Sequence, residues 1–107
     1  MATDDKQFPV WKPTIATLDR IHKIDRKVAY KALRNSCGSF IARPDVRKFV
    51  LENFNHRCVY CGSADNLQID HIISVYRAHI GDISIYDVNK LNNLQVLCNL
   101  CNAAKMP

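Results

Sequence analysis

The chain has 107 residues, of which 48% are hydrophobic and 23% charged, a composition typical of one globular domain and not of a disordered chain. Lysine and arginine outnumber aspartate and glutamate by 15 to 10, so the formal charge is +5. A basic surplus of this size in a small chain favours a polyanionic partner.

The N-terminal third is predicted to consist of a leader and one long helix. Residues 1–13 are expected to have little regular structure, because two prolines interrupt them. A helix is predicted from Thr14 to Asn35, with Gly38 as its stop, since apolar residues recur there at helical spacing. Its apolar face consists of Ile15, Leu18, Ile21, Ile24, Val28 and Ala32.

Basic side chains step along the same predicted helix by three and four residues, beside its apolar face, and no acidic residue interrupts them. They are either a solvated helix face or a surface that contacts phosphates. We call this set the basic stripe; it consists of Arg20, Lys23, Lys27, Lys31 and Arg34. Lys105, near the C-terminal end, is a further candidate for contact with nucleic acid.

A second helix is predicted over Pro44–Phe54, because Pro44 and Asp45 suit a first turn and apolar residues follow at helical spacing. The run Leu67–Ile73 is rich in β-forming residues and predicts a strand. A longer connection follows, with a short return strand expected around Ile83–Tyr86.

A final helix is predicted to begin between Asn89 and Asn92 and to carry Leu94 and Leu97. Asparagine is frequent in this part of the chain, although it is a poor residue for a helix interior. We therefore expect these side chains to serve as caps, backbone hydrogen-bond partners or metal contacts. They are Asn89, Asn92, Asn93, Asn99 and Asn102.

Four of the five cysteines form two Cys-x-x-Cys pairs, Cys58/Cys61 and Cys98/Cys101, which indicates metal ligation and not a disulfide framework. Four thiolates favour a closed, structural zinc site. An iron–sulfur cluster is the alternative, and two disulfides are less favoured still. Cys37 lies outside this pattern and is interpreted as a small apolar core residue.

The polar N-terminus lacks the basic start and apolar run of a signal peptide, and no apolar stretch approaches the length of a membrane span. Cysteines in metal-binding pairs suit a reducing compartment. We therefore expect a soluble, cytoplasmic protein with no membrane partner, in a bacterial or phage-encoded context.

The pair Asp70-His71 lies at the end of an otherwise apolar predicted strand. Two ionisable groups side by side in such a run are costly to bury without partners. Adjacent strand residues point to opposite faces, so the two side chains serve one site only if the strand ends or bulges there. From the pair alone, a structural and a catalytic role are both open.

Taken together and in order, these fragments resemble the HNH endonuclease family, in its zinc-stapled branch. The similarity covers roughly residues 50–105. It is carried by Cys58-x-x-Cys61, Leu67-Gln68-Ile69-Asp70-His71-Ile72, Asn93-Leu94-Gln95-Val96-Leu97-Cys98 and Cys101-Asn102-x-x-Lys105. The chain departs from the family pattern where Asn102 stands in place of the last histidine.

The resemblance implies an α+β fold with a ββα-metal (His-Me finger) nuclease core, preceded by two N-terminal helices and stapled by a structural zinc site of four cysteines. Residues 1–43 would then form a leader and basic helix, and residues 44–107 the nuclease domain, within one compact unit. The connection over residues 74–90 is longer than is common in the family. It contains His79, which either touches substrate or metal or is a surface histidine.

The resemblance also implies metal-dependent hydrolysis of DNA phosphodiester bonds, by nicking or by double-strand cleavage, the latter suggesting a homodimer. His71 matches the general base that activates water, and Asp70 matches a ligand of the catalytic Mg²⁺ or Mn²⁺. Asn102 would be the second metal ligand. Asn93 matches the central asparagine, which ties down the loop and holds the base in orientation.

Two other functions compete with the nuclease. One is a non-catalytic, zinc-stabilised nucleic-acid-binding module, and the other is a zinc-knuckle domain that binds proteins. The Asp70-His71 pair and Asn102 favour the nuclease, because binding alone needs none of these residues.

Overall fold

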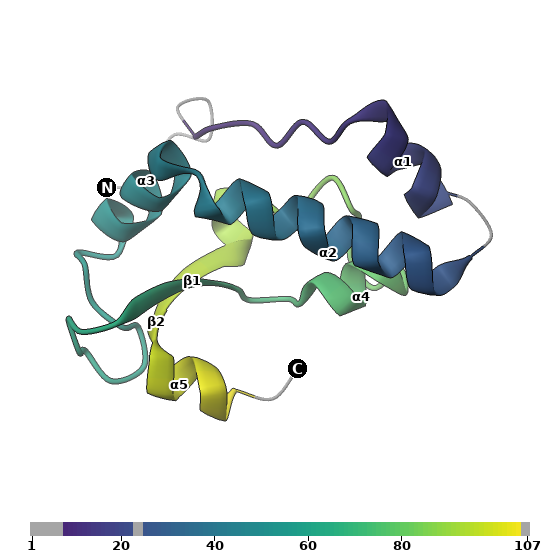
Figure 1. Ribbon diagram of the computed structural model, residues 1–107. Coiled ribbons are helices and arrows are strands. Elements are labelled where there is room, and N and C mark those ends of the chain that lie inside the picture. The colour runs from purple at the N-terminus through teal and green to yellow at the C-terminus, as the bar shows by residue number, and fades with distance from the viewer. Residues whose placement is uncertain (1–7, 23–24, 106–107) are drawn as a thin grey trace.

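The computed structural model describes residues 8–22 and 25–105, which form an α+β fold around a small antiparallel sheet of two strands (Figure 1). Among the described residues, no helix combines the length and the apolarity needed to cross a bilayer. The elements, in chain order, are α1 (Ile15–His22), α2 (Arg26–Ala42), α3 (Pro44–Asn53), β1 (Leu67–His71), α4 (Val75–His79), the 3-10 turn η2 (Leu91–Asn93), β2 (Leu94–Cys98) and α5 (Asn99–Ala104).

The helix predicted from Thr14 to Asn35 is in fact two helices, so three helices precede the sheet in the described part of the chain, and not two. Asp25 has an extended backbone and caps α2, because its carboxylate accepts hydrogen bonds from the backbone N–H groups of Lys27 and Val28 at 3.0 and 3.2 Å. The predicted positions Lys23 and Ile24 lie outside the described residues.

The break between the helices also makes the predicted apolar face wrong in part, although Ile21 does pack against the core. Ile15 is 79% exposed and Val28 is 46% exposed, and α1 buries no residue. Two helices separated by a cap need not share one face, so spacing counted across Asp25 carries no packing information. The buried face of α2 consists of Ala29, Leu33, Cys37 and Phe40. The interpretation of Cys37 as a core residue is therefore confirmed.

Gly38 does not stop the helix, since α2 continues to Ala42. Arg43 then has an extended backbone, with ψ 134°, because the ring of the following proline disfavours helical geometry in the residue before it. Pro44 begins α3, which ends at Asn53, so the second predicted helix is confirmed to within one residue.

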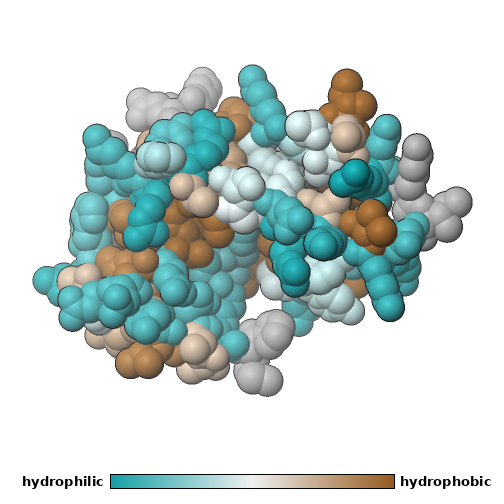
Figure 2. Space-filling view, in the orientation of Figure 1, coloured by the Kyte–Doolittle hydropathy of each residue, from teal (hydrophilic) through white to brown (hydrophobic). Residues whose placement is uncertain are grey.

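Three groups of buried side chains hold the described elements together, of which the smallest lies around Cys58, Leu97 and Cys98 and the other two join the helices to the rest. The larger of these two joins α3 to the strands, and Figure 2 shows hydrophobic side chains gathered in that region with hydrophilic ones around them. The other joins α2 to α4 and consists of Leu33, Cys37, Ala78 and Val88. Figure 1 shows α3 above the strands and α5 below them, so each face of the sheet carries a helix.

The segment after β1 differs from its prediction. The strand ends at His71 and not at Ile73, and the return strand expected around Ile83–Tyr86 is a series of turns. The helix α4 was not predicted. It begins after Ser74, whose hydroxyl accepts a hydrogen bond from the backbone N–H of Arg77 at 3.2 Å.

The run Leu94–Cys98, expected in a helix, is the strand β2, and all five of its residues are buried. Leu94 and Leu97 satisfy helical spacing, but a strand covered on both faces also reads as a continuous apolar run. β2 pairs with β1 so that Leu67 lies opposite Cys98 and His71 lies opposite Leu94. The helical part of this region is α5, which begins one residue after the strand.

Candidate functional site

The two cysteine pairs meet at the end of the sheet where β1 begins and β2 ends. The sulfur atoms of Cys58, Cys61, Cys98 and Cys101 all lie within 4.8 Å of one another, and those of Cys61 and Cys98 are 3.6 Å apart. A tetrahedral zinc ion with Zn–S bonds of about 2.3 Å would space its sulfur ligands about 3.8 Å apart. The cluster is therefore consistent with a structural zinc site.

Backbone hydrogen bonds fix each pair in place. The N–H of Gly62 donates to the carbonyl of Cys58 at 2.9 Å, and Gly62 takes the left-handed φ of 77° that this tight turn needs. The N–H of Val59 donates to Val96 of β2 at 2.9 Å. Cys98 caps α5, because its sulfur accepts a hydrogen bond from the backbone N–H of Cys101 at 3.4 Å.

The electrostatics of the cluster also favour a cation. Burial opposes ionisation of Cys58, but hydrogen bonds with the backbone outweigh this effect and lower the pKa of its thiol to about 6. A hydrogen bond with Cys98, burial and the neighbouring sulfurs raise the pKa of the Cys101 thiol to about 12. Four thiolates therefore cannot share this space without a positive ion between them.

At the opposite end of β1, the imidazole of His71 is buried and hydrogen-bonded. Its Nε2 lies 2.7 Å from the amide oxygen of Asn89, and the amide nitrogen of Asn89 donates to the sulfur of Cys37 at 3.4 Å. Burial lowers the pKa of His71, although the hydrogen bond with Asn89 and the charge of Asp70 act in the other direction. The imidazole is therefore neutral at pH 7.

Asp70 has different partners from its neighbour His71. Its carboxylate accepts hydrogen bonds from the amide of Gln95 at 3.0 Å and from the ammonium of Lys105 at 2.6 Å. The same ammonium donates to the backbone carbonyls of His71 at 2.6 Å and of Ile72 at 3.4 Å. At the end of β1, the ammonium of Lys105 is thus surrounded by one carboxylate oxygen and two backbone carbonyl oxygens.

Asn102 does not contact Asp70. Its amide donates instead to the side-chain oxygen of Gln68 at 2.5 Å. Gln68 and Asp70 are two residues apart in β1, so both side chains lie on the face covered by α5. The structure therefore places the two predicted metal ligands on one face of the sheet, each with another partner.

Asn93 ties the segment after β1 to the segment before β2. Its side-chain oxygen accepts a hydrogen bond from the backbone N–H of Ile73 at 2.8 Å, and its amide donates to the carbonyls of Ile73 at 3.1 Å and Val88 at 2.8 Å. It does not contact the imidazole of His71. The direct partner of that imidazole is Asn89, which the sequence presented only as one of several asparagines.

The basic stripe is divided between two helices. Arg20 lies on α1, whereas Lys27, Lys31 and Arg34 lie on α2, and all four are exposed. The guanidinium of Arg34 lies 5.6 Å from the ring centroid of Tyr30. On its other sides, this ring contacts residues of α4: Tyr76 at 5.7 Å and His79 at 5.1 Å between ring centroids. His79 therefore packs in an aromatic group beside the stripe.

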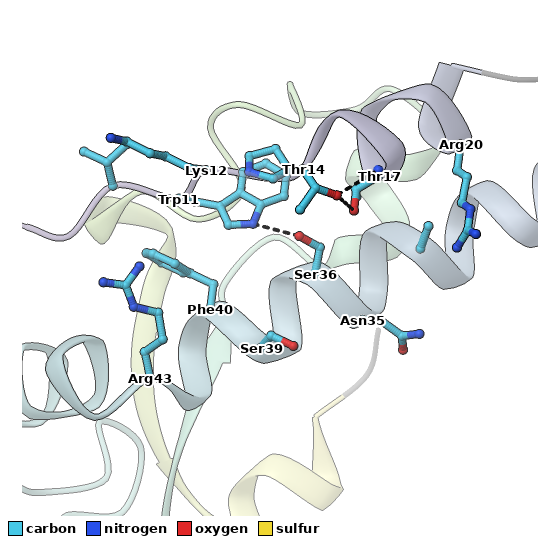
Figure 3. A pocket seen from close by; sticks show the side chains of 13 residues that line it. Trp11, Lys12, Thr14, Thr17, Arg20, Asn35, Ser36, Ser39, Phe40 and Arg43 are labelled. Atoms are coloured by element: carbon cyan, nitrogen blue, oxygen red, sulfur yellow. Dashed lines mark hydrogen bonds between the residues drawn. The ribbon is translucent and has the colours of Figure 1, made fainter.

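A groove of about 500 Å³ lies between the N-terminal segment and α2 (Figure 3). Trp11 closes one side of it and donates a hydrogen bond from its indole N–H to the hydroxyl of Ser36 at 3.0 Å. The charged side chains among the described lining residues are Lys12, Arg20 and Arg43, all basic. Arg43 is paired with Asp45 at 2.6 Å. The groove is a basic surface separate from the His71 site.

The family model of HNH endonucleases matches residues 58–107. Both cysteine pairs, the Asp70-His71 pair, Asn93 and Asn102 fall within this match. Residues 58–107 therefore match the HNH endonuclease family, as the resemblance predicted. No curated protein and no solved structure matches the chain significantly.

Proposed function

We propose that this protein is a metal-dependent endonuclease that hydrolyses the phosphodiester bonds of DNA. One observation carries the proposal: a buried, neutral imidazole, His71, directly follows a carboxylate, Asp70, that already holds a positive charge. A base for water and a site for a cation are the two parts that hydrolysis of an anionic diester requires.

His71 acts as the general base in this proposal. Nε2 faces an amide oxygen, which only accepts, so Nε2 carries the proton and Nδ1 holds the free electron pair. Nδ1 has no hydrogen-bond partner among the described residues, so in this proposal it is the nitrogen that receives a proton from water. A water molecule at Nδ1 would transfer its proton there as its oxygen attacks phosphorus. The bond from phosphorus to the leaving sugar oxygen would break in the same step, and that oxygen would take a proton from solvent.

The oxygen atoms around the ammonium of Lys105 fit a hard divalent cation. Asp70 would hold Mg²⁺ or Mn²⁺, with Asn102 as the second ligand after its amide leaves Gln68. The cation would neutralise charge on the phosphate oxygens. Lys105, once released from Asp70, would be free to contact the DNA backbone.

The remaining parts support this chemistry. The zinc would be structural, joining the strand of His71 to the helix of Asn102. Residues 44–107 would form the nuclease domain, and residues 1–43 would add the basic stripe for phosphate contacts. Because one active site cuts one strand at a time, cleavage of both strands would require a homodimer.

The proposal is tested with zinc-loaded protein and supercoiled plasmid, in Mg²⁺ or Mn²⁺ and in EDTA. We expect metal-dependent nicking, which His71→Ala lowers by about 10²–10⁴-fold. His22→Ala, which changes an exposed histidine of α1, is the matched control and should cut like the parent. Equal zinc content and melting temperature show that His71→Ala is folded, and His71→Gln provides a second, larger replacement. Nicking by His71→Ala at the parental rate would overturn the proposal.

The second candidate is a DNA-binding module without catalysis. It is favoured by the present partners of the two proposed metal ligands. Asp70 is hydrogen-bonded to Lys105, and Asn102 is hydrogen-bonded to Gln68. The two functions separate in one measurement. Salt-dependent DNA binding with no metal-dependent cutting would support the binding module.

A further inference from the structure

We propose that Cys37 and Asn89 form a positioning relay that fixes the tautomer of His71. Through this relay, helix α2 helps to position the catalytic base, although α2 lies outside the residues that match the HNH family. This inference rests on the proposed role of His71, but its main measurement does not depend on DNA cleavage.

The relay is a continuous chain of two hydrogen bonds through the protein interior. Nε2 of His71 lies 2.7 Å from Oδ1 of Asn89, and Nδ2 of Asn89 lies 3.4 Å from Sγ of Cys37, an ordinary length for a bond to sulfur. The three residues are 8%, 3% and 0% exposed. They come from the end of β1, the connection before β2, and α2, so the chain links three parts of the fold.

The two ends of the Asn89 amide have opposite chemistry, and this difference selects the tautomer. An oxygen facing Nε2 requires a proton on Nε2, which leaves Nδ1 unprotonated and able to accept a proton from water. If the amide turned over, its NH₂ group would face Nε2, and the proton of the neutral imidazole would move to Nδ1. His71 would then have no free electron pair on Nδ1, the nitrogen that accepts the proton from water in the proposed function.

Cys37 keeps the amide from turning. Its sulfur is the acceptor for the Asn89 NH₂ group, and its buried neighbours Leu33, Ala78 and Val88 are apolar. Burial raises the pKa of the Cys37 thiol to about 11, so the sulfur remains a neutral group at pH 7. Without this sulfur, neither orientation of the amide would be preferred at that end.

A packing role alone does not require sulfur at position 37, and this distinguishes the relay from core filling. Cys37→Ala removes the acceptor with a small loss of volume, whereas Cys37→Ser keeps an acceptor in a side chain of similar size. Asn89→Asp replaces the amide with a group that accepts at both ends, so it should hold the proton on Nε2 whichever residue occupies position 37.

The experiment is ¹⁵N NMR of the histidine side chains in the full, zinc-loaded chain without DNA. The parent and Cys37→Ser should show His71 protonated on Nε2. Cys37→Ala should show a substantial fraction protonated on Nδ1, and Cys37→Ala with Asn89→Asp should return the proton to Nε2. Asn92→Leu, at an exposed asparagine of η2, is the matched control and should leave the tautomer unchanged.

Kinetics provide the second readout. In Cys37→Ala we expect kcat for nicking to fall about tenfold, less than the loss expected for removal of the base, with KM for DNA unchanged. Cys37→Ser should recover most of kcat. An Nε2-protonated His71 in Cys37→Ala, or equal loss of kcat in the Ala and Ser variants, would overturn the relay. A tautomer that responds to Cys37 in a protein that cuts no DNA would support the relay and reject the nuclease.

Discussion

The two ends of the small sheet carry two sites in different states of assembly. At the end where Leu67 pairs with Cys98, the four sulfurs already lie at a spacing suitable for zinc. At the end where His71 pairs with Leu94, Asp70 and Asn102 each contact another side chain. In the proposed function, the first site needs only its ion, whereas Asp70 and Asn102 must leave their present partners before they can bind one.

The difference follows from what fixes the ligands. Each cysteine pair is closed by a local hydrogen bond, from Gly62 to Cys58 in the first pair and from the backbone N–H of Cys101 to the sulfur of Cys98 in the second. Asp70 and Asn102 are long-range partners on a strand and a helix, and their polar groups require hydrogen bonds when no metal is bound. Lys105 supplies Asp70 with a counter-charge, so this carboxylate is paired when no metal is bound.

The largest expected effect is at the zinc end. Cys98→Ser, or a strong chelator, should release zinc and unfold at least β1, β2 and α5, because structural zinc contributes on the order of 10 kcal/mol to small zinc-bound domains. Zinc per chain and far-UV circular dichroism measure the result. Cys37→Ser is the control and should retain one zinc ion. If Cys98→Ser retained both its zinc and its melting temperature, the cysteine cluster would not be the zinc site.

The next effect is at the cation end. Lys105→Met removes the positive charge that competes with a metal for Asp70, so Mn²⁺ affinity should rise about tenfold, equivalent to about 1.4 kcal/mol. Titration of zinc-loaded protein with Mn²⁺, followed by electron paramagnetic resonance, measures it. Lys48→Met, at an exposed lysine of α3, should change nothing. Unchanged Mn²⁺ affinity in Lys105→Met would mean that the metal does not displace this ammonium.

A smaller effect concerns DNA binding by α2, which is linked to His71 at the cation end through Asn89. If the basic stripe binds phosphates, Lys27→Glu with Lys31→Glu should weaken DNA binding and reduce the slope of log affinity against log salt by about one for each lysine–phosphate pair removed. Fluorescence anisotropy at several salt concentrations gives both quantities. An unchanged slope would identify the stripe as a solvated helix face.

The two ends also differ in how much of each the sequence revealed. The cysteine cluster was predictable because the spacing within each pair is local, and zinc chemistry limits the choice of residues. The partner of His71 was not predictable, since Asn89 lies 18 residues from His71 and 52 residues from Cys37. Only the fold brings such distant residues together, and the sequence does not show which of several asparagines contacts His71.

Among the secondary-structure elements, the errors also have physical causes. Asp25 lies inside an apolar pattern of helical spacing, yet its carboxylate begins a new helix. The strand β2 is buried on both faces, so it lacks the alternation by which a half-exposed strand is detected. The first part of α3 was predictable because proline at a first turn restricts the backbone locally.

The smallest expected effect is the loss of stability at high pH that arises from the Cys37 thiol, which is buried near the His71 end and not in the cysteine cluster. Burial raises the pKa of Cys37 to about 11, from 9.0 for an ordinary thiol, so the folded protein favours the neutral form. This contribution to stability is complete below pH 9 and is lost as the pH rises from 9 toward 11. Between pH 8 and pH 9.5 the free energy of unfolding should fall by roughly 1 kcal/mol more in the parent than in Cys37→Ser, whose hydroxyl does not titrate. Urea unfolding of both zinc-loaded proteins measures the difference, in which the zinc-site cysteines cancel. An equal fall in the free energy of unfolding in the parent and in Cys37→Ser would mean that the interior tolerates the Cys37 thiolate. Burial would then not hold this thiol in its neutral form.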